Sequence, residues 1–236
     1  RSYAAIQAIS SRLKEDQITV VGNGSACVVG GHAYVIKKGQ RFITNSAVAA
    51  MGYDLPAAIG AWTASRDSRC YSQGRDRSGE DLILVTGDGS IQMNLQELQT
   101  IIHHKMGIKI FLINNGGYHS IRQTQKNFFG EPLIGIGVDS GDLSFPDMEK
   151  LAGAYGYPYI KAEHNSELAK AVEQTLAVEG PVICEIFVSM DQNFEPKSSA
   201  KRLPDGTLVS PPLEDLAPFL PEEEMDRNMI IPRIRE

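Results

Sequence analysis

The chain has 236 residues, 42% of them hydrophobic, which suits one large α/β domain or a domain with a long tail. With 29 acidic against 23 basic residues the net charge is −6, which argues against broad binding to nucleic acid or to anionic membranes, because both need clustered positive charge. The three cysteines, Cys27, Cys70 and Cys184, are widely spaced without a CxxC pair, so we expect small core residues, not a disulfide framework or a cysteine-held metal site.

The same features indicate a cytoplasmic protein. The first residues are polar and charged, so we expect no signal peptide. No apolar run approaches the roughly 20 residues that a membrane-spanning helix needs.

Taken in chain order, the hydrophobic pattern alternates between helices and strands up to residue 188. The first half is predicted to contain a helix at 3–14, a strand at 18–21, a turn at 22–25, a helix at 26–36, a strand at 41–44, a helix at 55–65, a polar loop at 66–80 and an apolar strand at 82–85. The second half is predicted to contain a helix after Ser90 with Met93, Leu95, Leu98, Ile101 and Ile102, an apolar strand at 108–113, a Gly-rich stretch at 130–141, a helix at 145–155, a strand at 157–161, a helix at 166–178 and a strand at 182–188.

This alternation predicts an α/β fold, a three-layer parallel sheet with helices on both faces. The pattern ends at Asp191, and seven of the twelve prolines lie between Pro196 and Pro232. We therefore predict a domain over 1–190 and an extended Pro-rich C-terminal tail over 191–236, which wraps over a neighbour or is partly disordered.

Polar residues follow two of the apolar strands. Gly87-Asp88-Gly89-Ser90 ends one strand, and Asn114-Asn115-Gly116-Gly117 ends the other. Ligands of open α/β sheets bind at the carboxyl ends of the strands, so Asp88 and Asn115 come together if these strands are neighbours. A carboxylate and an amide oxygen suit magnesium or calcium, the glycines let the backbone approach a phosphate, and a helix N-terminus favours an anion. Each motif alone is typical of a turn, but together they predict a metal–diphosphate site.

At this point the sequence resembles a known family. Gly-Asp-Gly followed by Asn-Asn resembles the signature of thiamine diphosphate enzymes, and the stretch 44–61, which contains Met51-Gly52, resembles the acetolactate synthase-like branch. The resemblance covers residues 1 to about 190 and corresponds to the C-terminal diphosphate-binding domain of such enzymes.

The resemblance implies that Asp88, Asn115 and the backbone oxygen of Gly117 hold magnesium. The positions implied to lie against thiamine diphosphate and the reacting atoms are Asn23, Ser25, Met51, Gly52, Gly87, Gly89, Ser90 and Ile121. Met51 would hold the cofactor bent, and the backbone of Gly52 would bond its aminopyrimidine. A packing methionine at position 51 and a helix N-cap at Ser25 remain open alternatives.

The implied reaction is decarboxylation of a pyruvate-like 2-oxo acid with carboligation to a second carbonyl compound. His119 and Arg122 are the best polar candidates near the reacting atoms, for proton transfer and for a carboxylate or phosphate, unless they belong to a solvated helix face. Acetolactate synthases carry a tryptophan where this chain has Thr124, so the acceptor is open, with a keto-sugar as one hypothesis.

The family takes its activating glutamate from a pyrimidine-binding domain, on the same precursor or on another subunit. We therefore expect a homo-oligomer in which this chain alone is catalytically incomplete. FAD would be expected only if a middle domain exists elsewhere.

Two other functions remain open, a simple 2-oxo acid decarboxylase subunit and a non-catalytic cofactor-binding or assembly module. A nicotinamide-binding dehydrogenase is disfavoured, because the turn at 22–27 lacks the third glycine of G-x-G-x-x-G.

Overall fold

The computed structural model describes residues 2–67 and 80–233. The chain divides into two compact units, Arg1–Gln192 and Asn193–Glu236, each considered by itself. Most of the loop predicted at 66–80, with Cys70, lies outside the described residues, whereas Cys27 is half-buried and Cys184 is buried, both as free thiols.

The first unit is built on one parallel sheet, as the sequence predicts. Its strands are β1 (Ile18–Val21), β2 (Arg41–Ile43), β3 (Leu82–Gly87), β4 (Ile108–Asn114), β5 (Tyr159–Ala162) and β6 (Val182–Phe187). They lie in the order β2-β1-β3-β4-β6-β5, and every neighbouring pair is parallel. The strands β3 and β4 are buried on both sides, which explains why they read as continuous apolar runs.

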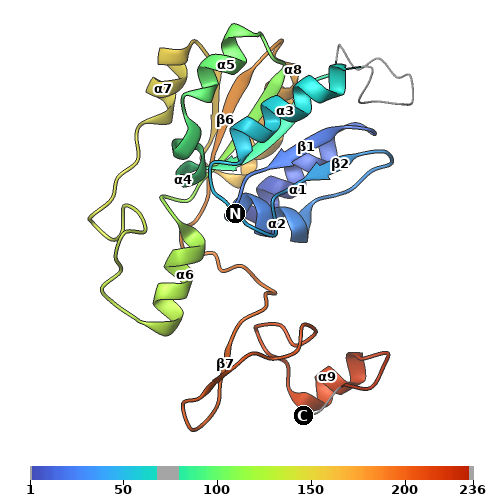
Figure 1. Ribbon diagram of the computed structural model, residues 1–236, viewed down its shortest axis with the longest axis vertical. Helices are drawn as coiled ribbons and strands as arrows, with labels where there is room; N and C mark the ends of the chain where they lie inside the picture. The colour runs from blue at the N-terminus through green and yellow to red at the C-terminus, as the bar shows by residue number, and fades with distance from the viewer. Residues whose placement is uncertain (1, 68–79, 234–236) are drawn as a thin grey trace. The chain divides into compact units, whose positions relative to one another are not determined.

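Helices cover both faces of the sheet (Figure 1). The helices are α1 (Ser2–Arg12), α2 (Ser25–Ala33), α3 (Asp54–Arg66), α4 (Asp88–Ile91), α5 (Glu97–His103), α6 (His119–Phe128), α7 (Met148–Tyr155) and α8 (Leu168–Ala177), with short 3₁₀ turns η1 (Gln92–Asn94) and η2 (Asn165–Glu167). On one face lie α1, α2 and α8, and on the other lie α3, α5 and α7. The three-layer α/β prediction is thus confirmed.

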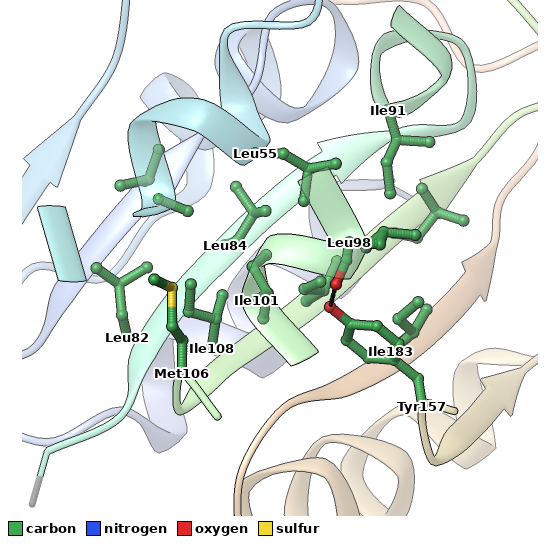
Figure 2. Close-up of a cluster of buried hydrophobic side chains, with 14 of the residues drawn as sticks. Leu55, Leu82, Leu84, Ile91, Leu98, Ile101, Met106, Ile108, Tyr157 and Ile183 are labelled. Carbon is green, nitrogen blue, oxygen red and sulfur yellow. Dashed lines mark hydrogen bonds between the residues drawn. The ribbon is translucent and has the colours of Figure 1, made fainter. Parts of the chain in front are cut away.

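One hydrophobic core cluster lies between the sheet and the layer of α3, α5 and α7. Figure 2 shows this cluster, in which Leu55 of α3 and Leu98 and Ile101 of α5 pack over strand residues such as Leu84. Burying one such side chain contributes about 1.5–3 kcal/mol. The hydroxyl of Tyr157 donates a hydrogen bond to the Leu98 carbonyl at 2.8 Å, so this buried polar group is satisfied.

Several helix boundaries differ from the sequence-based expectation. The helix expected after Ser90 starts at Asp88 and is broken into α4, η1 and α5. The helix expected at 145–155 begins only at Met148, because Asp147 is its N-cap and accepts the Lys150 N–H at 3.1 Å. The sequence predicts no bounds for α6, since this segment is mostly polar, and it indicates a helix here only as the solvated-face alternative for His119 and Arg122.

The chain reverses direction across the sheet between β1 and β3. From β1 the chain moves through α2 to β2 at one edge, and from β3 it moves through α4 and α5 to β4 on the opposite side. The carboxyl ends of β1, β3 and β4 therefore flank a topological switch point, where ligands of open α/β sheets bind.

The second unit contains the antiparallel pair β7 (Lys201–Arg202) and β8 (Leu208–Val209) and the short helix α9 (Glu222–Asn228). None of the helices in the described parts of the chain is long and apolar enough to cross a membrane.

Candidate functional site

The two motifs singled out in the sequence meet at the carboxyl edge of the sheet. The strands β3 and β4 are neighbours with Gly87 opposite Ile113, so Asp88 and the loop 114–117 emerge side by side. The carboxylate of Asp88 accepts the N–H of Gly117 at 2.9 Å through one oxygen and the N–H of Gly89 at 3.0 Å through the other. The structure thereby brings together the three expected metal-binding positions, Asp88, Asn115 and Gly117.

Asp88 is a buried carboxyl group, with 4% of its surface exposed. Burial raises its pKa to about 6, and the backbone N–H groups of Gly117, Gly89 and Gly116 and the charge of Arg122 hold back part of this rise. A cation beside this carboxylate would offset the cost of burying its charge.

Asn115 presents an unpaired acceptor at the same place. Its side chain is 5% exposed, and its Nδ2 donates to the hydroxyl oxygen of Ser25 at 2.6 Å. Its Oδ1 is buried and has no hydrogen-bond partner among the residues that the structure describes. An unsatisfied buried acceptor costs about 1–3 kcal/mol, so an orphan oxygen beside a buried carboxylate fits a site for a hard cation.

The turn after β1 faces the same site. Ser25 is the first residue of α2 and its hydroxyl is engaged by Asn115, whereas Gly24 is the N-cap and forms no side-chain cap. The N-cap alternative for Ser25 is therefore wrong, and the first N–H groups of α2 are left for an anion. Asn23 donates from its side chain to the Ala49 carbonyl and so ties this turn to the segment before Met51.

The Met51-Gly52 turn is fastened to the Gly-Asp-Gly motif. The N–H of Gly52 donates to the Ser90 hydroxyl at 3.0 Å, and Asn94 donates to the Gly52 carbonyl at 2.6 Å. A Cβ at Gly52 would lie 2.8 Å from the Cβ of Met93, so only glycine allows this approach. Both backbone groups of Gly52 thus already have protein partners, and Met51 is half-buried beside them.

His119 and Arg122 lie inside the protein, so the alternative of a solvated helix face is wrong. Arg122 is 1% exposed and forms an ion pair with Asp139 at 2.8 Å. Nε2 of His119 lies 2.6 Å from the Gln192 carbonyl oxygen, so this nitrogen carries the ring proton. Burial lowers the pKa of His119, helped by the charges of Arg122 and Lys126 and opposed by the Gln192 carbonyl and Asp191. The proton-transfer and substrate-binding roles of these two residues stay predictions. Ile121 lies on the exposed side of α6.

Three acids near the site were missed, of which Glu185 and Asp54 are buried. Asp139 is the partner of Arg122. Glu185 of β6 accepts hydrogen bonds from the side chain of Asn114 at 2.7 Å and from the Tyr159 hydroxyl. The sequence signal that could have identified it is a charged residue inside the apolar run of β6. Asp54, in the first turn of α3, is fully buried and accepts from the Thr86 hydroxyl, and no feature of its neighbours in the sequence distinguishes it from an exposed acid.

Comparison with known proteins agrees with this geometry. The family model described as "Thiamine pyrophosphate enzyme, C-terminal TPP binding domain" matches residues 22–186; thiamine pyrophosphate is another name for thiamine diphosphate. The acetolactate synthase large subunit of Cyanidium caldarium is 34% identical over 157 residues, which are 66% of this chain and 24% of that protein. Acetolactate synthase 1, chloroplastic, of Nicotiana tabacum is 29% identical over 196 residues, which are 81% of this chain and 27% of that protein.

Among solved structures, benzoylformate decarboxylase from Polynucleobacter necessarius has the same fold, with a TM-score of 0.66 and 21% sequence identity over 82% of this chain and 34% of that one. The chain spans about a quarter of the length of the curated relatives named above. The matched segment begins at Gly22 and includes Met51-Gly52, Asp88 and the loop 114–117, the residues that the fold gathers at one edge of the sheet. The chain therefore belongs to the thiamine pyrophosphate enzymes and corresponds to their C-terminal TPP-binding domain.

Proposed function

We propose that this chain holds the diphosphate of thiamine diphosphate through Mg²⁺, and that the enzyme containing it decarboxylates a pyruvate-like 2-oxo acid and joins the product to a second carbonyl compound. The observation that carries the metal assignment is the buried, unpartnered Oδ1 of Asn115 beside the buried carboxylate of Asp88. The names of the relatives, acetolactate synthases, support the carboligation.

The donor set suits magnesium. Asp88 supplies one carboxylate, Asn115 one amide oxygen, and the Gly117 carbonyl is the third expected ligand. Mg²⁺ typically binds one or two carboxylates together with phosphate oxygens and water, not an all-protein cage. Consistent with this, no group of three or more His, Cys, Asp and Glu side chains gathers within the described residues.

When bound, thiamine diphosphate supplies the electron sink for decarboxylation. The protein's own residues bind and orient. The first turn of α2 and the N–H of Ser90 would hold the diphosphate, whereas the N–H of Gly89 is already bonded to Asp88. Asn94 and Ser90 fix the Met51-Gly52 turn, and α6 would form the substrate side with Ile121, Ser120 and Thr124 on its exposed surface.

A pyrimidine-binding domain completes the site in this proposal. Four large apolar side chains near the site are exposed: Val48, Met93, Ile121 and Val138. Apolar groups that gather on a surface favour contact with another protein surface. A partner domain that covers them would also exclude water and bring the activating glutamate.

The proposed function is tested on the intact enzyme, with its pyrimidine-binding domain. Thiamine diphosphate with Mg²⁺ should raise the melting temperature, whereas the cofactor with a chelator, or NAD, should not. Product analysis with pyruvate, alone and with added aldehydes, 2-oxo acids or keto-sugars, then identifies the reaction. Ligated products support the proposal, acetaldehyde alone would indicate a simple decarboxylase, and stabilisation without turnover would indicate a cofactor-binding module. The chain assayed by itself serves as the control and should not decarboxylate pyruvate.

The pKa of Asp88 predicts a pH dependence of cofactor binding. The metal-free carboxyl group titrates at about 6, and its protonated form cannot bind a cation. The apparent affinity for Mg²⁺ with thiamine diphosphate should therefore fall about tenfold for each pH unit below about 6 and level off above 7. Calorimetric titrations from pH 5 to 8 measure this. Equal affinities at pH 5 and pH 7 would show that protons do not compete with the metal at Asp88.

A further inference from the structure

Arg122 is fully engaged by the protein. A guanidinium group has five N–H donors. Nε and Nη2 donate to the two carboxylate oxygens of Asp139, both at 2.8 Å, and Nη2 also donates to the Gly116 carbonyl at 3.1 Å. Nη1 donates to the Asn115 carbonyl at 3.3 Å and to Nδ1 of His119 at 3.4 Å. Every donor has a partner, so none is left for a substrate carboxylate.

The partners of Arg122 are the backbone of the loop 114–117 and one acid from a distant segment. Asp139 belongs to the Gly-rich stretch 130–141, which lies antiparallel to the loop through a bridge between Gly117 and Gly137. The Tyr118 N–H donates to the Ile136 carbonyl at 2.7 Å, and the Val138 N–H donates to the Gly116 carbonyl at 3.2 Å. The Gly-rich stretch therefore packs along the loop 114–117, and Arg122 links the stretch to the loop.

We propose that Arg122 and Asp139 form a clamp that fixes the loop 114–117 so that its metal ligands are in place before the cation binds. Arg122 is then a positioning residue and does not bind substrate. With the Asn115 and Gly116 carbonyls held from one side, the Asn115 side chain is directed to Ser25 and the Gly117 N–H to Asp88. The proposal rests on the proposed metal site and adds what holds it.

The clamp depends on the shape of arginine as well as on its charge. A planar guanidinium binds a carboxylate through two parallel hydrogen bonds and still has donors for two carbonyls. Lysine has the same charge but only three donors on one nitrogen, so it cannot reach Asp139 and both loop carbonyls at once. Supporting groups behind metal ligands typically change metal affinity about 10–100-fold.

The test is Mn²⁺ binding to the intact enzyme in the presence of thiamine diphosphate, followed by electron paramagnetic resonance. Arg122→Gln is expected to weaken Mn²⁺ binding about 10–100-fold, and Arg122→Lys should not restore it. Asp139→Asn should weaken it in the same direction by a smaller factor. Lys126→Gln is the matched control, because Lys126 lies one turn further along α6 in an exposed ion pair with Asp191. This variant should bind Mn²⁺ as tightly as the wild type does.

Hydrogen exchange of the metal-free protein gives a readout that needs no cofactor. In Arg122→Gln the amides of Gly117, Tyr118 and Val138 should exchange faster, while those of β3 and β4 remain protected. If Arg122→Gln does not fold, Asp139→Asn decides, since it removes no donor from the loop carbonyls.

Three results would overturn the clamp. The first is wild-type Mn²⁺ affinity in Arg122→Gln or, where that variant does not fold, in Asp139→Asn. The second is full recovery of Mn²⁺ affinity in Arg122→Lys. The third is an increase in the KM for the 2-oxo acid without a change in Mn²⁺ affinity, which would identify Arg122 as a substrate ligand. If instead the wild type itself binds no Mn²⁺ with thiamine diphosphate, the proposed metal site fails and not the clamp alone.

Discussion

Replacing Asp88 with asparagine is expected to reduce metal-dependent binding of thiamine diphosphate by more than 100-fold, beyond the roughly 10–100-fold that loss of an outer-shell partner costs. The variant removes the one carboxylate of the proposed donor set and keeps the shape of the side chain. The metal-free variant should nevertheless stay folded, because the buried carboxylate that it lacks destabilises the folded state when no cation is present.

The sign of this stability effect follows from the pKa. Burial raises the folded-state pKa of Asp88 from 3.8 to about 6, so the stability linked to this group is fully present below pH 4 and is lost as the pH rises through about 6. The shift corresponds to about 3 kcal/mol at pH 7. Asparagine avoids this loss but places an amide against one of the two N–H donors, at a cost of about 1–2 kcal/mol. We therefore expect the metal-free variant to be about 1 kcal/mol more stable at pH 7 than the parent.

Urea unfolding of both metal-free proteins between pH 4 and 8 measures the effect. The parent should lose stability over the window from about 4 to 6, and Asp88→Asn should not. Asp191→Asn is the control, because replacing this exposed carboxylate should change neither the stability nor the affinity for the cofactor. If Asp88→Asn binds the cofactor with wild-type affinity, Asp88 is not a ligand of the metal.

The parts of the molecule that local pattern determines could be predicted from the sequence. The strands β3 and β4 are buried on both faces, so continuous apolar runs identify them, and their parallel pairing brings Asp88 and Asn115 together. The break between α4 and α5 could not be predicted, because helical hydrophobic spacing continues through Leu95 and Leu98 while the chain turns between them.

What could not be predicted depends on contacts that are distant in sequence. From the sequence, Arg122 is expected to be a surface residue in a polar helix. It is buried because the Gly-rich stretch places Asp139 against it, and that stretch has no hydrophobic period from which its position could be predicted. Asp54 likewise is fully buried because α3 packs over the end of β3, where Thr86 meets it. The sequence pattern therefore brings the proposed metal ligands together, but it does not identify the residues that hold them.

Gly117→Ala is expected to damage both the fold and the site. Gly117 has a φ of 144°, a region that L-residues avoid at a cost of about 1–3 kcal/mol. A Cβ there would lie 2.1 Å from the Ile136 carbonyl oxygen, far inside van der Waals contact. The loop must then move away from the Gly-rich stretch and from Asp88, which loses the hydrogen bonds of Tyr118 to Ile136 and of Gly117 to Asp88. We expect unfolding to become easier by about 3 kcal/mol or more in total.

The measurements are the urea unfolding free energy and Mn²⁺ binding with thiamine diphosphate. Gly153→Ala is the matched control, because a Cβ at Gly153 meets no atom within 4 Å and lies inside α7, where alanine should add up to about 1 kcal/mol of stability. Asp88→Asn and Gly117→Ala should both strongly weaken Mn²⁺ binding but shift stability in opposite directions, since one removes a proposed ligand and the other displaces the loop that carries two proposed ligands. Normal Mn²⁺ binding by Gly117→Ala would mean that the conformation of this loop does not position the cation.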